Sequence, residues 1–106
     1  MSEQRDFTLD EVKDGLASRS ILLVDVREPH EFAQAHIPGA VNVPLSTFDP
    51  AALAPQPGQT VVFSCRSGTR TLKAIAAARA AGFPYDAHYP GSMLEWMAAG
   101  EPVETG

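Results

Sequence analysis

The sequence predicts an α/β fold built on a mostly parallel β-sheet. Short runs rich in β-branched residues alternate with segments of helical periodicity, and no repeat or low-complexity stretch interrupts them. Two of these runs, Ile21–Asp25 and Thr60–Ser64, are almost continuously apolar. Such runs are typical of central strands that are buried on both faces. The 106 residues, 44% of them hydrophobic, are enough for a single domain spanning residues 1–106.

The first part of the chain is expected to form a helix followed by a buried strand. Thr8–Glu11 has the capping-box pattern, in which a threonine and a glutamate three residues later satisfy main-chain amides at a helix start. The run Ile21–Asp25 then predicts a strand that ends in a carboxylate. The apolar residues between them share one helical face: Leu9, Val12 and Leu16.

The next elements are predicted to be short. Pro29 suits the first turn of a helix, and Glu31 lies near the positive end of that helix. The segment His36–Gly39 ends it, and Val41–Val43 predicts another strand. A short helix that is interrupted or restarted at a proline is expected over Ser46–Leu53.

The second half predicts a strand and a long helix. Thr60–Ser64 is the second strongly apolar strand, and the alanine-rich segment Thr69–Ala81 predicts a helix that Gly82 ends. The residues expected on the buried face of that helix are Leu72, Ile75 and Ala76.

A final strand and helix complete the predicted fold. The strand is expected around Ala87–Tyr89. Ser92–Glu95 has the capping-box pattern again, so Ser92 is expected to cap a helix that ends at Gly100. The side chains expected to pack in the core under this helix are Met93, Trp96 and Met97.

Composition and charge argue against several classes of protein. The net charge is -5 and no basic stripe is visible, so no nucleic acid partner is expected. The charged first twenty residues do not look like a secretory signal, no run could span a bilayer, and no membrane partner is expected. A cytoplasmic location is therefore the expectation. One cysteine and three scattered histidines predict neither a disulfide nor a metal site, and no cofactor is expected.

Cys65 is predicted to lie at the end of a buried strand, shortly before a helix. In open α/β sheets, ligands bind at the carboxyl ends of strands, and the amides of a strand–loop–helix connection favour anions. Gly68 allows a tight curve there, and Arg66 and Arg70 add positive charge. These features favour thiolate over thiol, so the pKa of Cys65 is expected to be lowered. The alternative, a buried unreactive cysteine beside solvated arginines, leaves Gly68 and the strand-end position unexplained.

Three segments resemble the signatures of rhodanese domains, in the same order along the chain. The central segment, Phe63–Arg70, resembles the active-site loop of that family. The N-terminal signature comprises Leu22–Glu28, Glu31–Phe32 and His36–Ala40 with Asn42 and Pro44. The C-terminal signature comprises Tyr89–Gly91, Trp96, Ala99–Gly100 and Pro102–Val103. The resemblance runs from about residue 9 to residue 104, which gives the expected core of the domain.

The resemblance implies a rhodanese-like fold, with a central five-stranded parallel sheet flanked by helices on both faces. It implies a sulfurtransferase in which the catalytic residue Cys65 cycles between thiolate and persulfide. The donor would be thiosulfate or another small sulfur-containing anion. The acceptor would be cyanide in vitro and a thiol or partner protein in the cell. The implied substrate-binding residues are Arg66, Ser67, Gly68, Thr69 and Arg70.

Two positions depart from the family pattern, and neither touches the loop. Ala35 stands where a glycine is usual, and Ser92 replaces the second glycine that commonly follows Gly91. Mercaptopyruvate-specific relatives usually place small neutral residues after the cysteine. Arg66 therefore favours thiosulfate as the donor.

Loop length separates sulfur transfer from phosphate chemistry. Four residues lie between Cys65 and Arg70, and residue 71 is threonine. Related phosphatases have a loop that is one residue longer. A shorter loop makes a smaller cradle, which suits a sulfur atom and its sulfonate better than a phosphate ester.

Four polar residues near the first strand are expected to support the site structurally. Arg27 and Glu31 are predicted to form an internal ion pair, and a catalytic role for Asp25, Arg27 and Glu31 is the alternative. His36 is expected to hydrogen-bond loop backbone, because a thiolate held by amides and arginines needs no general base. The supporting residues are Asp25, Arg27, Glu31 and His36.

The sequence leaves three other functions open. A sulfur-relay or protein-interaction module would use the same cysteine but exchange sulfur with proteins. A phosphatase or arsenate reductase is disfavoured by loop length. An inactive binding domain is disfavoured because Cys65, Arg66 and Arg70 are all present.

Overall fold

The computed structural model describes residues 4–106 and contains one five-stranded sheet in which every neighbouring pair is parallel. The strand order is β1-β5-β4-β2-β3. The first three residues of the predicted domain lie outside the described residues. The strands are β1 (Arg5–Asp6), β2 (Ile21–Asp25), β3 (Val41–Asn42), β4 (Thr60–Ser64) and β5 (Ala87–His88).

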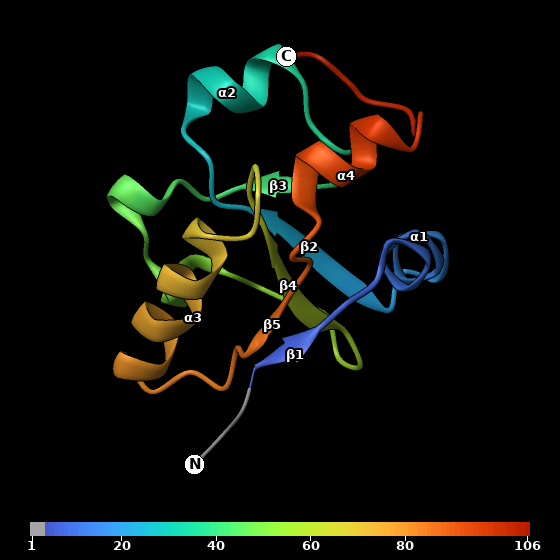
Figure 1. Ribbon diagram of the computed structural model, residues 1–106. Coiled ribbons are helices and arrows are strands. Elements are labelled where there is room, and N and C mark those ends of the chain that lie inside the picture. The colour runs from blue at the N-terminus through green and yellow to red at the C-terminus, as the bar shows by residue number, and fades with distance from the viewer. Residues whose placement is uncertain (1–3) are drawn as a thin grey trace.

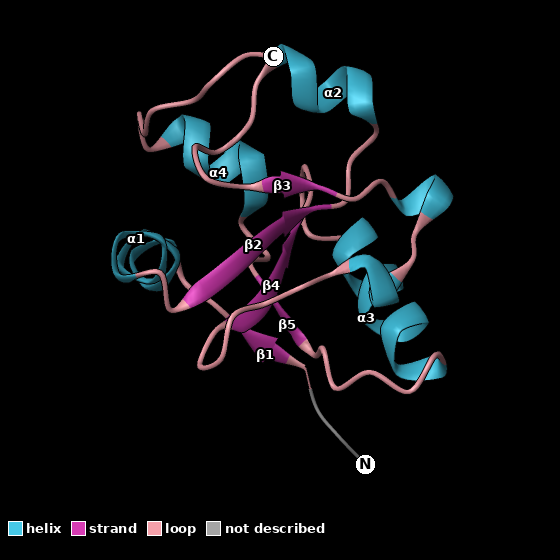
Figure 2. Ribbon diagram, turned by 180° about the vertical axis from the view of Figure 1, so that it is seen from behind, coloured by secondary structure: helices cyan, strands magenta, loops and turns pink. Residues whose placement is uncertain are grey.

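Helices cover both faces of this sheet, as Figures 1 and 2 show. Helices α1 and α4 lie on one side, and α3 lies on the other side. The α-helices are α1 (Leu9–Ser18), α2 (Pro29–Gln34), α3 (Arg70–Ala80) and α4 (Ser92–Ala98). Two short 3-10 helices, η1 (Leu45–Thr47) and η2 (Pro50–Ala52), connect β3 to β4. The fold class expected from the sequence is confirmed.

Two apolar cores fill the space between the sheet and its helices. On one side, Val12 of α1 and Trp96 of α4 pack with Leu23 and Val62 of the central strands. On the other side, Ala74 and Ile75 of α3 pack against alternate residues of the same strands, including Val24 and Phe63. Both central strands are therefore buried on both faces, which explains their continuous apolar sequences.

Most of the expected elements are present, with ends within a residue or two. The capping box at Thr8 is formed with Glu11, and Pro29 occupies the first turn of α2. The segment expected to be one interrupted helix over residues 46–53 is instead the two 3-10 helices η1 and η2. The two-residue strand β1 has no counterpart among the strands expected from periodicity, because two residues carry no periodic pattern.

Three side-chain predictions are wrong. In α3 the buried residues are Thr71, Ala74, Ile75 and Ala78, while Leu72 is 42% exposed and Ala76 is also exposed. The polar Thr71 faces inward, where its hydroxyl meets the buried His88. Met97 is 54% exposed, whereas Met93 and Trp96 are buried as expected.

Ser92 is not the cap of α4. The cap position is Gly91, and Ser92 is the first helical residue, with φ +52° and a fully buried side chain. Its hydroxyl points to the loop that contains Cys65 instead of to the helix amides. Within residues 4–106, no helix is long and apolar enough to cross a membrane.

Candidate active site

Cys65 lies where the central strand β4 ends and the chain turns into a tight loop before α3. Figure 1 shows this loop beyond the end of β4. The neighbouring strand β2 ends at the same edge, because Asp25 is paired in register with Ser64. The candidate loop residues Cys65 to Arg70 therefore sit at the carboxyl edge of the sheet, the usual place for a site in an open α/β fold.

The sulfur of Cys65 is enclosed by main-chain amides. The residue is 1% exposed. The Gly68 N–H donates to the sulfur at 3.1 Å, and the Ser92 hydroxyl lies 3.9 Å from it. The Cys65 N–H itself donates to the Ser92 hydroxyl at 3.0 Å, and this hydroxyl donates to the Tyr89 carbonyl. Ser92, in the C-terminal part of the chain, thus fixes the main chain of Cys65 at the start of the loop.

The pKa of Cys65 is lowered by this environment. Burial alone raises the pKa of the thiol, because it disfavours the charged form. Hydrogen bonding from the main-chain amides of Thr71, Gly68, Ser67 and Arg70 lowers it, and together they outweigh burial. The lowered pKa matches the sequence expectation. The largest lowering contributions come from the loop amides, and the charge of Arg70 also interacts with the sulfur.

Gly68 is required by the shape of the loop. Its φ of +91° lies in the left-handed region that side chains rarely adopt. A Cβ added there would lie 2.6 Å from the Pro90 carbonyl oxygen, so the backbone segment before α4 leaves no room for a side chain. The tight curve that the sequence predicted at this glycine is confirmed.

The two loop arginines have different roles in the structure. Arg70 forms a two-pronged ion pair with Glu31, with N–O distances of 2.6 and 3.0 Å. This hydrogen bond lowers the pKa of Glu31 to about 2 and raises the pKa of Arg70. Arg66 is exposed, and its guanidinium makes no hydrogen bond or ion pair within residues 4–106. Arg66 is therefore the loop cation that is free to meet an anion.

The ion pair predicted between Arg27 and Glu31 is wrong. The buried partner of Arg27 is Asp25, which accepts hydrogen bonds of 3.0 and 2.8 Å from Nε and Nη2 on one oxygen. Arg27 Nη2 also donates to the Ala35 carbonyl at 2.6 Å, and Nη1 donates to the main chain of Glu31. The carboxylates are exchanged relative to the prediction: Asp25 pairs with Arg27, and Glu31 pairs with Arg70.

His36 binds backbone at the end of α2. Its Nδ1 lies 2.8 Å from the Phe32 carbonyl, and its ring stacks on the Phe32 ring at 3.7 Å. Its main-chain amide and carbonyl pair with Glu104, near the C-terminus. The structure therefore places His36 as a tie between α2 and the C-terminal segment.

A groove opens beside the loop. Its volume is about 380 Å³, and it lies between α2 and α4. The exposed side chains of Leu94 and Met97 form an apolar wall, and Arg66 provides a positive charge. The lining residues are Arg27, Glu31, Gln34, Ala35, Arg66, Met93, Leu94 and Met97. Trp96 is not among them and donates its indole N–H to the Pro102 carbonyl.

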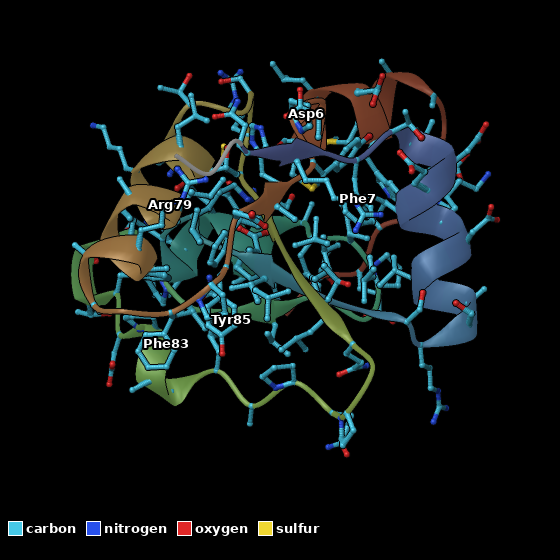
Figure 3. The ribbon with its side chains drawn as sticks, turned by 90° about the horizontal axis from the view of Figure 1, so that it is seen from below. Asp6, Phe7, Arg79, Phe83 and Tyr85 are labelled. Atoms are coloured by element: carbon cyan, nitrogen blue, oxygen red, sulfur yellow. The ribbon has the colours of Figure 1, made fainter. Side chains whose placement is uncertain are left out.

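A second hollow, of about 330 Å³, lies at the far end of α3. Arg79 and Phe83 line it, and the Phe83 ring stacks with Tyr85 at 5.5 Å. Figure 3 shows these three side chains together at that end of the helix. Because α3 begins at the loop and this hollow adjoins its last turn, the hollow does not belong to the candidate site.

Sequence reasoning missed two residues of the candidate site. Ser92 was expected at a helix start, and Thr71 was expected only to follow the short loop. Both are small hydroxyl residues with buried side chains next to the loop, and their partners come from distant parts of the chain. A sequence pattern gives no sign of such partners.

The rhodanese-like domain family matches residues 8–99, and the chain belongs to this family. A thiosulfate:glutathione sulfurtransferase of Saccharomyces cerevisiae is 31% identical over 115 residues, covering 94% of this chain and 83% of that protein. An uncharacterised protein of Synechocystis is 41% identical over 84 residues, which is 79% of this chain and 47% of that protein. The chain thus spans about half of the Synechocystis protein.

Solved structures agree with this assignment. The human single-domain sulfurtransferase TSTD1 superposes with a TM-score of 0.71 at 34% identity, covering 88% of this chain and 95% of that one. The fold, the single cysteine and the family match together identify the chain as a member of the rhodanese-like sulfurtransferase family.

Proposed function

We propose that this protein is a sulfurtransferase that carries sulfane sulfur as a persulfide on Cys65. The observation that carries the proposal is the cradle of main-chain amides around a cysteine sulfur whose pKa is lowered. A thiolate is the nucleophilic form of cysteine, and the same amides suit the negative charge of a persulfide.

The first step takes sulfur from a small anion such as thiosulfate. The Cys65 thiolate attacks the sulfane sulfur, a new S–S bond forms, and the bond to the sulfonate sulfur breaks. Sulfite leaves with the electron pair of that bond, so no external oxidant or reductant is needed. Arg66 is the residue we assign to the sulfonate, because it lines the groove beside the loop and carries an uncommitted charge.

The second step passes the sulfur to an acceptor. A thiolate or cyanide attacks the outer sulfur of the persulfide, and Cys65 leaves as the thiolate that began the cycle. The name of the yeast relative supports thiosulfate as donor and a thiol as acceptor. Ser67 and Gly68 would contribute through their main-chain amides, and Arg70 through its amide and its ion pair with Glu31. Thr69 would contribute as the residue from which the loop enters α3.

A steady-state assay tests the proposal. With thiosulfate and cyanide, the wild-type protein should form thiocyanate, and Cys65→Ser should form none, because an alkoxide is far harder to generate than a thiolate. The same protein should not hydrolyse aryl phosphates, since the loop is too short to wrap a phosphoryl group. Hydrolysis of aryl phosphate without thiocyanate formation would overturn the proposal.

A sulfur-relay module is the second candidate function, favoured by the exposed apolar wall of Leu94 and Met97 beside the loop. It would use the same Cys65 persulfide but take sulfur from a protein. Comparing the rate of sulfur uptake from thiosulfate with that from a persulfidated protein separates the two candidates.

A further inference from the structure

A network of hydrogen bonds leads from the edge of the sheet to the candidate loop. The buried imidazole of His88 on β5 lies 3.0 Å from Asp6 Oδ1 through Nε2 and 2.8 Å from Thr71 Oγ1 through Nδ1. The Thr71 hydroxyl donates to the Gly68 carbonyl at 2.8 Å, and the Gly68 N–H donates to Cys65 Sγ at 3.1 Å. Figure 3 shows Asp6 on the edge strand β1, from which the network starts.

The donors and acceptors of this network place a hydrogen on Nδ1 of the imidazole. The Thr71 hydroxyl has one hydrogen, so when it donates to Gly68 it can only accept from the ring, and Nδ1 must carry a hydrogen. The Asp6 carboxylate lies 3.0 Å from Nε2, on the other side of the ring.

A hydrogen on Nε2 alone would change the partner of Thr71. With a hydrogen kept on Nε2 toward Asp6, Nδ1 becomes an acceptor and draws the Thr71 hydroxyl to itself. The Gly68 carbonyl then loses its donor. The Gly68 carbonyl is thus held by the Thr71 hydroxyl, while the Gly68 N–H donates to the sulfur. The Thr71 main-chain amide also lowers the pKa of Cys65.

Few other ionisable groups face His88. The elements packed against β5 are β1, β4 and α3. Asp6 comes from β1, while β4 places Phe63 opposite His88 and continues into Cys65. The buried positions of α3 carry no ionisable side chain: Thr71, Ala74, Ile75 and Ala78. The titratable partners in this network are therefore Asp6 directly and Cys65 through the loop.

We propose that Thr71 and His88 are positioning residues for Cys65: the imidazole Nδ1–H keeps the Thr71 hydroxyl on the Gly68 carbonyl, and this contact holds the loop amides around the sulfur. The proposal rests on the proposed function only in taking Cys65 as the reacting group. It adds to the amide cradle a buried hydrogen-bond network, which starts at the exposed carboxylate of Asp6 on the edge strand.

The first test is the rate of alkylation by iodoacetamide as a function of pH, which reports on the single cysteine alone. Thr71→Val keeps the shape of the side chain but removes the hydroxyl. Below the thiol midpoint we expect it to react about three- to tenfold more slowly than wild type, because the midpoint moves up by up to about one pH unit.

Two conservative variants should keep the wild-type alkylation rate of Cys65. Thr71→Ser keeps the hydroxyl, and His88→Asn offers an amide N–H at the position of Nδ1, so both should react as wild type does. Thr60→Val, at the opposite end of β4, is the matched control and should change nothing. A wild-type alkylation profile in Thr71→Val, or a slow Thr71→Ser, would overturn the proposal. Circular dichroism melts establish that each variant is folded.

The second test needs no variant. Imidazole ¹⁵N shifts of the wild-type protein should show a hydrogen on His88 Nδ1 under the conditions in which Cys65 reacts as a thiolate. An unprotonated Nδ1 under those conditions would place the Thr71 hydroxyl on the ring and contradict the proposal. Sulfur uptake from thiosulfate is measured separately. Uptake without the alkylation effect refutes only the positioning role, and the alkylation effect without uptake refutes only the sulfurtransferase function.

Discussion

Cys65 and Arg66 are neighbours in the sequence with opposite environments. The cysteine is 1% exposed in its cradle of amides, whereas the arginine is exposed at the edge of the groove. The two environments suit two different proposed roles. Main-chain amides stabilise the sulfur anion, and a side chain that is free to move meets the incoming donor. Arg70 is held by Glu31 and is not free for that task.

We expect Arg66→Ala to weaken binding of the donor and leave the thiol unchanged. Loss of a charge-assisted contact to the sulfonate should raise the KM for thiosulfate about tenfold to a hundredfold. Arg79→Ala removes the same charge from the last turn of α3 and is the matched control. Equal KM values in the Arg66 variant, the control and the wild type would mean that Arg66 has no part in binding the donor.

Among the elements, the loop between β4 and α3 depends on one glycine. Gly68 combines a φ of +91° with close approach to the Pro90 carbonyl, whereas Gly58 has a φ of +86° with nothing within 4 Å of an added Cβ. Comparing alanine substitutions at the two glycines therefore separates the cost of a positive φ from the cost of insufficient space for a side chain.

Gly58→Ala should cost about 1 kcal/mol in the free energy of unfolding, because only the positive φ is strained. Gly68→Ala should cost more, and it should abolish sulfur transfer because the loop must move to make room. Urea unfolding and the thiocyanate assay measure the two effects. An active Gly68→Ala with the same stability as Gly58→Ala would show that the close approach to Pro90 is not required.

The elements also show what a sequence can predict. The strands β2 and β4 and the helix α3 follow from continuous apolar runs and an alanine-rich segment, and the Cys65 loop follows from its glycine and its place at a strand end. The two-residue strand β1 is too short to give a periodic pattern in the sequence. The exchanged ion pairs could not be predicted, because Asp25 and Glu31 are both close to Arg27 in sequence and Arg70 is far from either. The buried role of Ser92 depends on a φ of +52° that no residue pattern signals.

At the scale of the whole molecule, the parallel sheet brings the ends of β2 and β4 together, and the Glu31–Arg70 pair links α2 to α3 across that edge. The pair lowers the pKa of Glu31 to about 2. A carboxylate whose pKa is lower in the folded state stabilises the fold at pH values above its unfolded pKa. It loses this contribution as the pH falls to its folded pKa.

The stability difference between wild type and Glu31→Gln should therefore shrink as the pH falls from about 5 to about 2. At neutral pH we expect wild type to be more stable by on the order of 1 kcal/mol, since both side chains are partly exposed and solvent weakens the pair. Urea unfolding at several pH values measures it. A constant difference across this range would mean that Glu31 titrates alike in the folded and unfolded chains.

The central claim is that sulfur is carried on Cys65, and the intact mass of the protein tests it most directly. After incubation with excess thiosulfate, wild-type protein should gain the mass of one sulfur atom on the peptide that contains Cys65. Cyanide or a small dithiol should then restore the starting mass, and Cys65→Ser should gain nothing. A wild-type mass that never changes with thiosulfate, or a sulfur that remains bound in Cys65→Ser, would contradict the account.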